Sequence, residues 1–319
     1  MASQKDVKSR ISSVKNIQKI TRAMEMVAAA RLRRAEQRIE ALRPYARAVR
    51  RMTRRTVEAV ENIPNLPLLE EHDEVNRVGL LLITGDRGLA GAFNSQIVRA
   101  GNRRAAELKA EGKEVVWYAS GKRGVSSLQF RGLDVAVAHQ GFTDRPAFAN
   151  ARDIAGDVAS QYVDGKVDRV EIIFNHYESP LTQTVRENTL LPLQAMAQVM
   201  AEAEGEGGEE DDSDDGASAD AAPDDAESGD DHSRSLWIYE PEPEDILQRL
   251  VPDFIEITIF RALLESTASE HGARMTAMRN AQENAGEMID DLTLEMNRQR
   301  QAEITQEIME VVAGAEGLT

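Results

Sequence analysis

The 319-residue sequence contains no cysteine. Disulfide bonds and thiolate chemistry are therefore excluded, and cysteine usage says nothing about the redox compartment. No apolar run reaches the roughly 18 residues of a membrane-spanning helix, and the first residues lack the apolar centre of a secretion signal. We therefore expect a soluble chain that carries neither a membrane span nor an export signal.

Lysine and arginine are missing from residues 202–231, where 15 acids account for most of the net charge of −17. Apart from one proline, residues 201–233 have no apolar side chain larger than alanine. Such a segment cannot bury enough surface to offset the entropy cost of ordering. We predict a disordered acidic insertion at 201–233.

Acids are scarce at the other end of the chain. Residues 1–55 contain 16 Lys or Arg and only 4 acids. A surface of this charge would attract an acidic partner or nucleic acid. A solvated helix face is the simpler interpretation of the same residues, and the local sequence does not decide between the two.

Proline is absent after Pro252, and apolar side chains recur there at helical spacing up to Ile304, Ile308 and Val311. A C-terminal helix at 253–319 would be on the order of 90 Å long, which is more than a compact domain needs. We expect residues 234–252 to lead into this helix, with Pro252 near its first turn.

A second long helix is predicted at residues 1–61. Its apolar residues, among them Ile17, Ile20 and Met24, recur at steps of three and four, and Pro44 predicts a bend or a local adjustment. Two such helices at opposite ends of a chain predict an antiparallel coiled coil.

The middle of the chain alternates between short apolar runs and amphipathic segments. The expected strands are 78–84, 114–119, 134–139 and 169–175, and the expected helices are 93–110, 122–130 and 146–163. This alternation predicts a small doubly wound, Rossmann-like α/β domain at 76–200, at one end of the coiled coil. The pattern does not decide the structure of residues 185–200.

Two glycine-containing turns partly match nucleotide-binding motifs. Gly85, Gly88 and Gly91 follow a strand, but their spacing is Gly-x-x-Gly-x-x-Gly and no acid follows the second strand to hold a ribose. Residues 120–123 (SGKR) lack the first glycine and the final Ser or Thr of a phosphate-binding loop. We interpret both as tight turns and exclude nucleotide hydrolysis by this chain.

The other polar residues form no catalytic or metal-binding pattern. The histidines are scattered without ligand spacing, and the acids of residues 70–74 resemble solvated loop charges more than a catalytic pair. We expect no cofactor, no metal site and no active site on this chain.

Six stretches at the two ends and in the middle fit one known pattern. They are residues 10–16 (RISSVKN), 20–29 (ITRAMEMVAA), 86–91 (DRGLAG), 273–278 (ARMTAM), 284–285 (NA) and 297–308 (NRQRQAEITQEI). Together they resemble the γ subunit family of the F-type ATP synthase, over nearly the whole chain and most closely at both termini.

The resemblance implies a non-catalytic rotor. In that family the paired helices stand inside a ring of three α and three β subunits, and the α/β domain forms a foot on the membrane c-ring beside the ε subunit. Ion flow turns the ring and the shaft, which drives the catalytic subunits to make ATP from ADP and phosphate. The family also helps to regulate ATPase activity and proton flow. It implies a peripheral place at the cytoplasmic face of the cell membrane, reached only through partner subunits.

The resemblance also implies roles for single residues. Met24, Arg300 and Gln301 are expected at the contact between the rotor and the β subunits, although an ordinary place in the helix seam explains Met24 equally well. Tyr239 and Glu240 are expected where the foot meets the ring and ε.

Further contacts are expected along the shaft. The arginines of the first helix would face acidic elements of the surrounding subunits, and residues 311–315 would form an apolar bearing. The arginines are Arg31, Arg33, Arg34 and Arg38. The alternative function is a basic coiled-coil protein that binds nucleic acid through the same positive charge.

Overall fold

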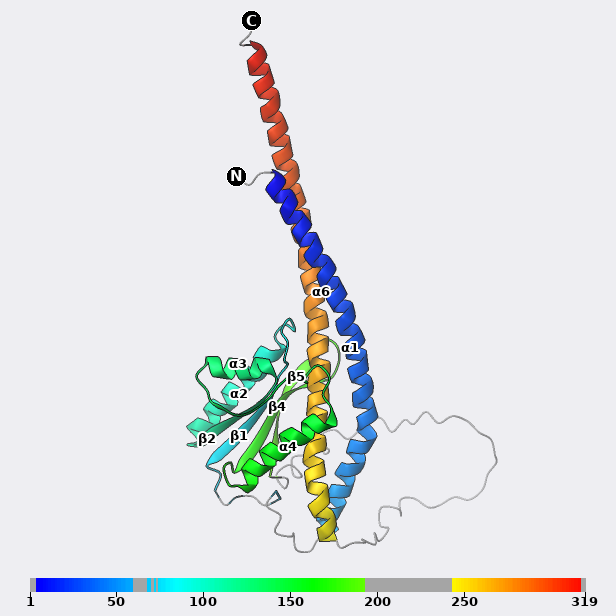
Figure 1. Cartoon of the computed structure of the whole chain (residues 1–319), viewed down its shortest axis with the longest axis vertical. Helices are drawn as coiled ribbons and strands as arrows, with labels where there is room; N and C mark the ends of the chain where they lie inside the picture. The colour runs from blue at the N-terminus through cyan, green and yellow to red at the C-terminus, as the bar shows by residue number, and fades with distance from the viewer. Residues whose placement is uncertain (1–3, 60–67, 70–71, 73, 193–242, 317–319) are drawn as a thin grey trace, which may run out of the picture.

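The structure is a computed structural model and describes residues 4–59, 68–69, 72, 74–192 and 243–316. A shaft of two long helices, α1 (Gln4–Ala59) and α6 (Pro243–Glu316), stands beside an α/β domain that packs against its lower half (Figure 1). The predicted fold class is therefore confirmed. Tyr239, Glu240 and the acidic insertion at 201–233 lie outside the described residues.

The two helices of the shaft run antiparallel. The Gln18 side chain donates a hydrogen bond to the Gln282 carbonyl oxygen at 3.5 Å, and Arg279 donates to Glu25 at 3.0 Å. As residue numbers rise along α1, those of the facing residues of α6 fall, down to Ala268 beside Leu32 and Ala35. The helix continues through Pro44, so this proline does not end α1.

The seam of α1 follows a regular heptad. Its buried and half-buried residues are Val7, Ile11, Val14, Gln18, Thr21, Glu25, Ala28, Leu32, Ala35, Ile39, Leu42, Ala46 and Val49. The predicted seam residues Ile17 and Ile20 are 54% and 59% exposed, so their assignment to the seam is wrong. A row at steps of three and four that begins at Val7 reaches positions 18 and 21, and an uninterrupted helix keeps one row.

Helix α6 differs from the prediction at both ends. It begins at Pro243 and holds Pro252 in its interior, not in its first turn. Buried Val251, Phe254 and Ile255 on either side of this proline hold the helix against the core. At the other end, α6 extends beyond the start of α1 (Figure 1), and the side chains at 300–311 are exposed, including Ile304, Ile308 and Val311. The coiled coil therefore ends before the last helix does.

The sheet has the strand order β3-β2-β1-β4-β5. Strands β1 (Arg77–Ile83), β2 (Glu114–Ser120), β3 (Val135–His139) and β4 (Arg169–Tyr177) are parallel, and β5 (Gln183–Leu191) pairs antiparallel with β4. The prediction left β5 undecided.

Helices cover both faces of the sheet. Leu80 and Leu82 point to the face covered by α2 (Phe93–Ala110) and α3 (Lys122–Phe130). Leu81 and Ile83 point to the face covered by α4 (Phe148–Val163) and the lower part of α6. The shaft helix α6 is thus part of the domain core.

We expect Leu32→Ala to lower the free energy of unfolding by about 2–5 kcal/mol, because Leu32 is 4% exposed in the seam. The control is Ile20→Ala, which removes an isomeric side chain from the exposed row and should change stability by about 0.5 kcal/mol or less. Urea unfolding of the full chain measures both. Equal losses in the two variants would contradict the observed seam.

Candidate functional site at the carboxyl edge of the sheet

The shaft helix α6 crosses the place where doubly wound sheets hold their ligands. Such folds bind ligands outside the carboxyl ends of the strands, where the strand order reverses. Here the order reverses between β1 and β4. The Ser266 hydroxyl donates to the Ile83 carbonyl oxygen in β1 at 3.4 Å, and the Ser269 hydroxyl donates to that of Asn175 in β4 at 3.2 Å. The crevice of this sheet therefore holds a helix of the same chain.

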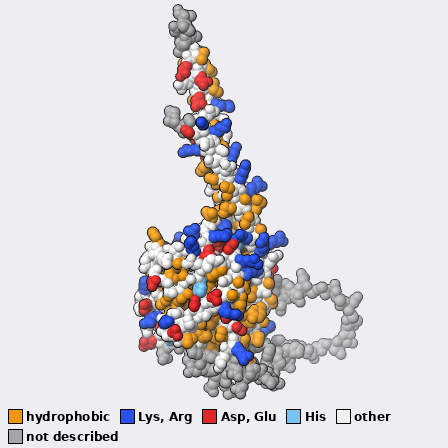
Figure 2. All heavy atoms as spheres, viewed as in Figure 1, with side chains coloured by type: hydrophobic (Ala, Val, Ile, Leu, Met, Phe, Trp, Pro, Cys, Tyr) orange, Lys and Arg blue, Asp and Glu red, His pale blue; other side chains and the backbone are white. Residues whose placement is uncertain are grey.

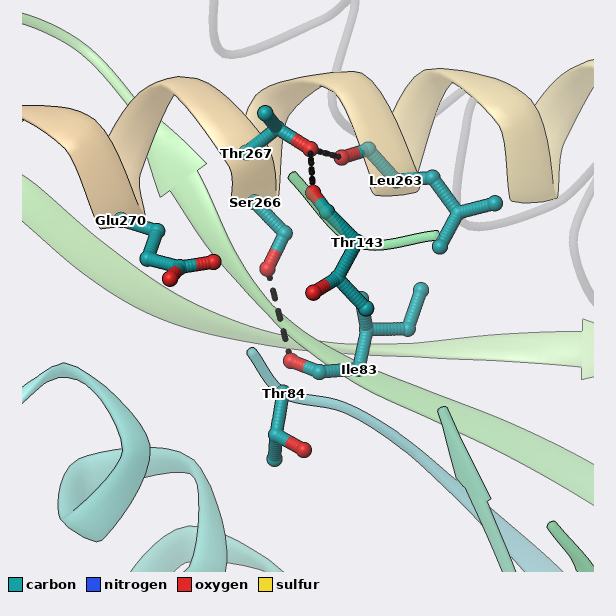
Figure 3. Close-up of a pocket in the computed structure, with 7 residues that line it drawn as sticks. All are labelled: Ile83, Thr84, Thr143, Leu263, Ser266, Thr267 and Glu270. Carbon is teal, nitrogen blue, oxygen red and sulfur yellow. Dashed lines mark hydrogen bonds between the residues drawn. The ribbon is translucent and has the colours of Figure 1, made fainter. Parts of the chain in front are cut away.

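A small cavity remains beside this crossing (Figure 3). Its lining residues are Ile83, Thr84, Thr143, Leu263, Ser266, Thr267 and Glu270. Its volume of about 10 Å³ is close to that of a single water molecule. No nucleotide fits here.

An acidic side chain of the chain itself occupies the N-terminus of α3, the helix that follows β2. Helix N-termini attract anions because their first N–H groups are unpaired. At the start of α3, the Lys122 N–H donates to Asp86 Oδ1 at 2.9 Å, and the Gly124 N–H donates to the Thr84 hydroxyl at 2.9 Å. Asp86 and Thr84 thus pair N–H groups at the start of α3 that an anion could otherwise bind.

Asp86 has further donors. Its Oδ2 accepts from the N–H groups of Gly141 and Thr143 at 2.9 and 3.1 Å, and from the Thr143 hydroxyl at 3.0 Å. Burial alone would raise the pKa of this carboxyl, but the hydrogen bonds from Gly141, Lys122 and Thr143 outweigh burial and hold the pKa below its ordinary value. The carboxylate stays ionised and fixed.

A buried ion pair on α6 faces the glycine turn after β1. Glu270 accepts from Arg274 one helical turn further on, and Arg274 also donates to the Gly88 carbonyl oxygen at 3.3 Å. A Cβ atom at Gly85 would lie 2.6 Å from Glu270 Oε2, so a side chain there would displace the Glu270 carboxylate. Burial raises the pKa of Glu270 against the opposing effect of Arg274.

The neighbouring His271 is only 1% exposed. Its Nδ1 lies 3.2 Å from Arg274 Nη1, and its Nε2 lies 3.9 Å from Asp144. Burial, and then the positive charge of Arg274, lowers the pKa of His271 to about 4. The imidazole is therefore neutral at physiological pH.

Helix α1 is joined to the same region by polar contacts. Arg31 pairs with Asp144, and Arg38 donates to the Pro146 carbonyl oxygen. The Tyr177 hydroxyl, at the end of β4, donates to Glu36. We use the name polar junction for these contacts of α1 together with the polar contacts of residues 265–274 of α6, all at the carboxyl edge of the sheet.

The polar junction corrects one expectation. Arg31 and Arg38 bind within the chain, so the prediction that all four arginines face a partner is wrong for these two. Burial, and then the positive charge of Arg145, lowers the pKa of Arg38. Arg33 and Arg34 are exposed and can meet a partner.

The structure separates the residues predicted to contact the β subunits. Met24 is half-buried at the edge of the seam, one residue before Glu25, which lies opposite Arg279. Arg300 and Gln301 are adjacent and exposed, about 30 Å further along α6 at 1.5 Å per residue. Met24 and this pair cannot belong to one local contact.

The shaft above the α/β domain exposes many apolar side chains. Figure 2 shows hydrophobic side chains gathered there, with Lys and Arg side chains beside them. Ile17, Ile20 and Val27 form the exposed row on α1, and Ile308 and Val311 are exposed near the end of α6. A surface of this kind marks a contact with another molecule.

Sequence reasoning missed most of the polar junction. Residues 265–271 read as polar, yet all are buried. The available signal was the small-residue run of residues 266–269 (STAS), which lets a helix approach a sheet edge closely, and the spacing of four between Glu270 and Arg274, which allows an ion pair. In the described ranges, no group of three His, Asp or Glu residues could hold a metal ion.

Comparison with known proteins gives the family. A family model described as ATP synthase matches residues 3–318. The chain is 38% identical over 318 residues to the ATP synthase gamma chain of Rubrobacter xylanophilus, covering 100% of this chain and 99% of that one. It is 40% identical over 321 residues to the one of Paracoccus denitrificans, covering all of both chains. The chain belongs to the ATP synthase gamma chain family.

Solved structures of this kind share the fold. A chain in the structure of the central stalk and c-ring of the Tetrahymena thermophila mitochondrial ATP synthase has a TM-score of 0.57 and 25% identity, with coverage of 82% of this chain and 99% of that one. A chain of the Euglena gracilis mitochondrial enzyme has a TM-score of 0.62 and 16% identity, with coverage of 99% and 94%.

We expect the free energy of unfolding to fall as pH falls from 6.5 to 4, in part because of His271. The unfolded chain binds a proton at this histidine below its ordinary pKa of 6.5, whereas the folded chain does so only below about 4. Between pH 7 and pH 5 this histidine removes about 2 kcal/mol of stability, at 1.4 kcal/mol per pH unit.

His271→Gln keeps a neutral polar side chain and should make the loss of stability between pH 7 and pH 5 smaller by about that 2 kcal/mol. Urea unfolding of both full chains at the two pH values is the measurement. The same loss in both chains would show that His271 is protonated in the folded state as readily as in the unfolded one.

Proposed function

We propose that this chain is the rotor subunit of an F-type ATP synthase, which carries the rotation of an ion-driven membrane ring to the catalytic subunits. The observation that carries the proposal is the polar junction. A domain that fixes one helix in its ligand crevice and holds a second by side-chain contacts can turn both as one body. A rotor needs such a joint between its foot and its shaft.

The partners follow from the family and from the surfaces. The shaft above the α/β domain would stand inside a ring of three α and three β subunits, with the exposed row of α1 and the end of α6 against them. The α/β domain would sit on the c-ring beside ε. Through these contacts, the chain would also help to regulate ATPase activity and proton flow.

The chemistry would take place on other subunits. The crevice of this sheet is filled by α6, and the N-terminus of α3 is paired with Asp86, so we infer that the chain has no active site and needs no cofactor. Among the described helices, none is long and apolar enough to cross a membrane. We place the chain peripherally, at the cytoplasmic face of a bacterial cell membrane, held through its partner subunits.

Co-purification tests this function. A tag on this chain, in solubilised membranes of the source organism, should bring down ATPase activity together with three α and three β subunits. Recovery of DNA in place of these subunits would favour the alternative, a basic coiled-coil protein that binds nucleic acid; the named relatives give that alternative no support.

We expect the double variant Arg300→Ala, Gln301→Ala to assemble but to lower ATP synthesis and hydrolysis, because both exposed side chains would contact β subunits. Arg298→Ala is the control: it removes an exposed arginine about 200° around the same helix from Arg300. Membrane vesicles carrying each assembled complex give both rates. Wild-type rates in the double variant would rule out this contact.

A further inference from the structure

We propose that the loop between β3 and α4, residues 140–147, is a clamp that Asp86 holds in shape and through which the α/β domain grips both helices of the shaft. The inference deepens the proposed function: the role of the clamp in carrying torque rests on the chain being a rotor subunit. Asp86 is then a positioning residue: its hydrogen bonds go to the loop and to the start of α3, and it acts on the shaft through the loop.

Asp86 fixes the loop from the inside of the domain. Its Oδ2 binds the Gly141 N–H, the Thr143 N–H and the Thr143 hydroxyl, and its Oδ1 binds the first residue of α3. The Asp86 N–H in turn donates to the Thr143 hydroxyl at 2.8 Å. The loop thus has its conformation set by one carboxylate that is itself tied to the end of β1.

One arm of the loop reaches α6. The Thr267 hydroxyl shares its one proton between the Thr143 carbonyl oxygen at 2.9 Å and the Leu263 carbonyl oxygen at 2.7 Å, as Figure 3 shows. Thr143 and Thr267 are both 5% exposed. Since water is nearly excluded there, the loss of this contact would leave buried polar groups unpaired.

The other arm reaches α1. Asp144, the next residue of the loop, pairs with Arg31. The Pro146 carbonyl oxygen accepts from Arg38, which lies two turns of α1 beyond Arg31. The Arg31–Asp144 pair is about one third exposed on both sides, so its strength alone is modest. Its effect on position depends on a loop that does not move.

The clamp adds contacts from the α/β domain to those that the two helices make along their own seam. At this height Leu32, Ala35 and Ala268 form the buried apolar contact, with Ile39, Tyr177 and Met275 packed against it. Further up the seam holds Gln18, Thr21 and Ala28. Arms to both helices make the domain and the shaft turn together.

The first test measures position in the full chain, which has no cysteine of its own. Spin labels on Glu40→Cys in α1 and Asp153→Cys in α4, both exposed, report the distance between shaft and domain. Asp86→Ala should raise the fraction of molecules outside the wild-type distance peak by at least about tenfold, since several hydrogen bonds to a charged acceptor are lost. Glu187→Ala is the control, because this acid pairs with Arg103 away from the shaft; it should leave the peak unchanged.

Two milder variants keep the test valid if Asp86→Ala does not fold. Arg31→Met removes only the Arg31–Asp144 pair of the arm to α1, and Thr267→Val removes only the Thr267–Thr143 contact of the arm to α6, with a side chain of nearly the same shape. Arg31→Met should broaden the same distance peak. An unchanged distance peak in Arg31→Met, and also in Asp86→Ala where that variant folds, would overturn the clamp.

The second test measures torque. In inverted vesicles, complexes with Arg31→Met or Thr267→Val should pump fewer protons per ATP hydrolysed than the wild type. Wild-type vesicles that hydrolyse ATP through this complex without pumping would contradict the proposed function. Wild-type vesicles that pump, together with variants that pump equally well per ATP, would contradict the clamp alone.

Discussion

The burial of polar residues 265–271 on α6 is the constraint on which the rest of the structure depends. A helix that is enclosed on all sides must pair its polar groups inside the protein, since an unpaired buried group costs about 1–3 kcal/mol. Here each hydrogen bond of this segment joins one side chain of α6 to one fixed partner atom. Ser266 and Ser269 bind the carbonyl oxygens of two different strands, and His176 Nδ1 of β4 lies 2.6 Å from Glu265. An apolar surface could slide along the sheet, but this one is fixed in rotation and in height.

The buried charges serve orientation more than stability. A pair such as Glu270 and Arg274 costs desolvation that its attraction barely repays, and an apolar pair of the same shape is often equally stable. The pair also borders the turn after β1, because a side chain at Gly85 would have to displace the Glu270 carboxylate. Glycine at this position therefore lies against the shaft helix and not against a nucleotide.

Sequence periodicity predicted the parts of the fold in which one face is buried. Helices α2 and α3 have the predicted bounds, since each has one buried stripe. Periodicity could not decide between two apolar rows of α1, because Ile17 and Ile20 are as apolar as any seam residue. Only the partner helix selects the row with Gln18 and Thr21.

Two other features were beyond this kind of reasoning. Strand β5 carries Arg186, Glu187 and Asn188 at the edge of the sheet, so it has neither the apolar run of a buried strand nor a regular alternation. The polar junction joins residues more than a hundred positions apart, such as Arg31 with Asp144 and Thr143 with Thr267. Their charges are visible in the sequence, but which of them meet is decided by the path of α6 across the sheet.

The same crossing explains how a ligand-binding architecture can work without a ligand. In a doubly wound domain, strand ends and helix N-termini present unpaired backbone groups at one edge, and those groups need a partner. Asp86 pairs those at the start of α3, and the hydroxyls of α6 pair those at the ends of β1 and β4. Because both partners belong to the chain, the edge is permanently occupied and stiff. Because these contacts belong to one chain and do not dissociate, they fix the α/β domain to the helices, as is required for the domain to turn the shaft.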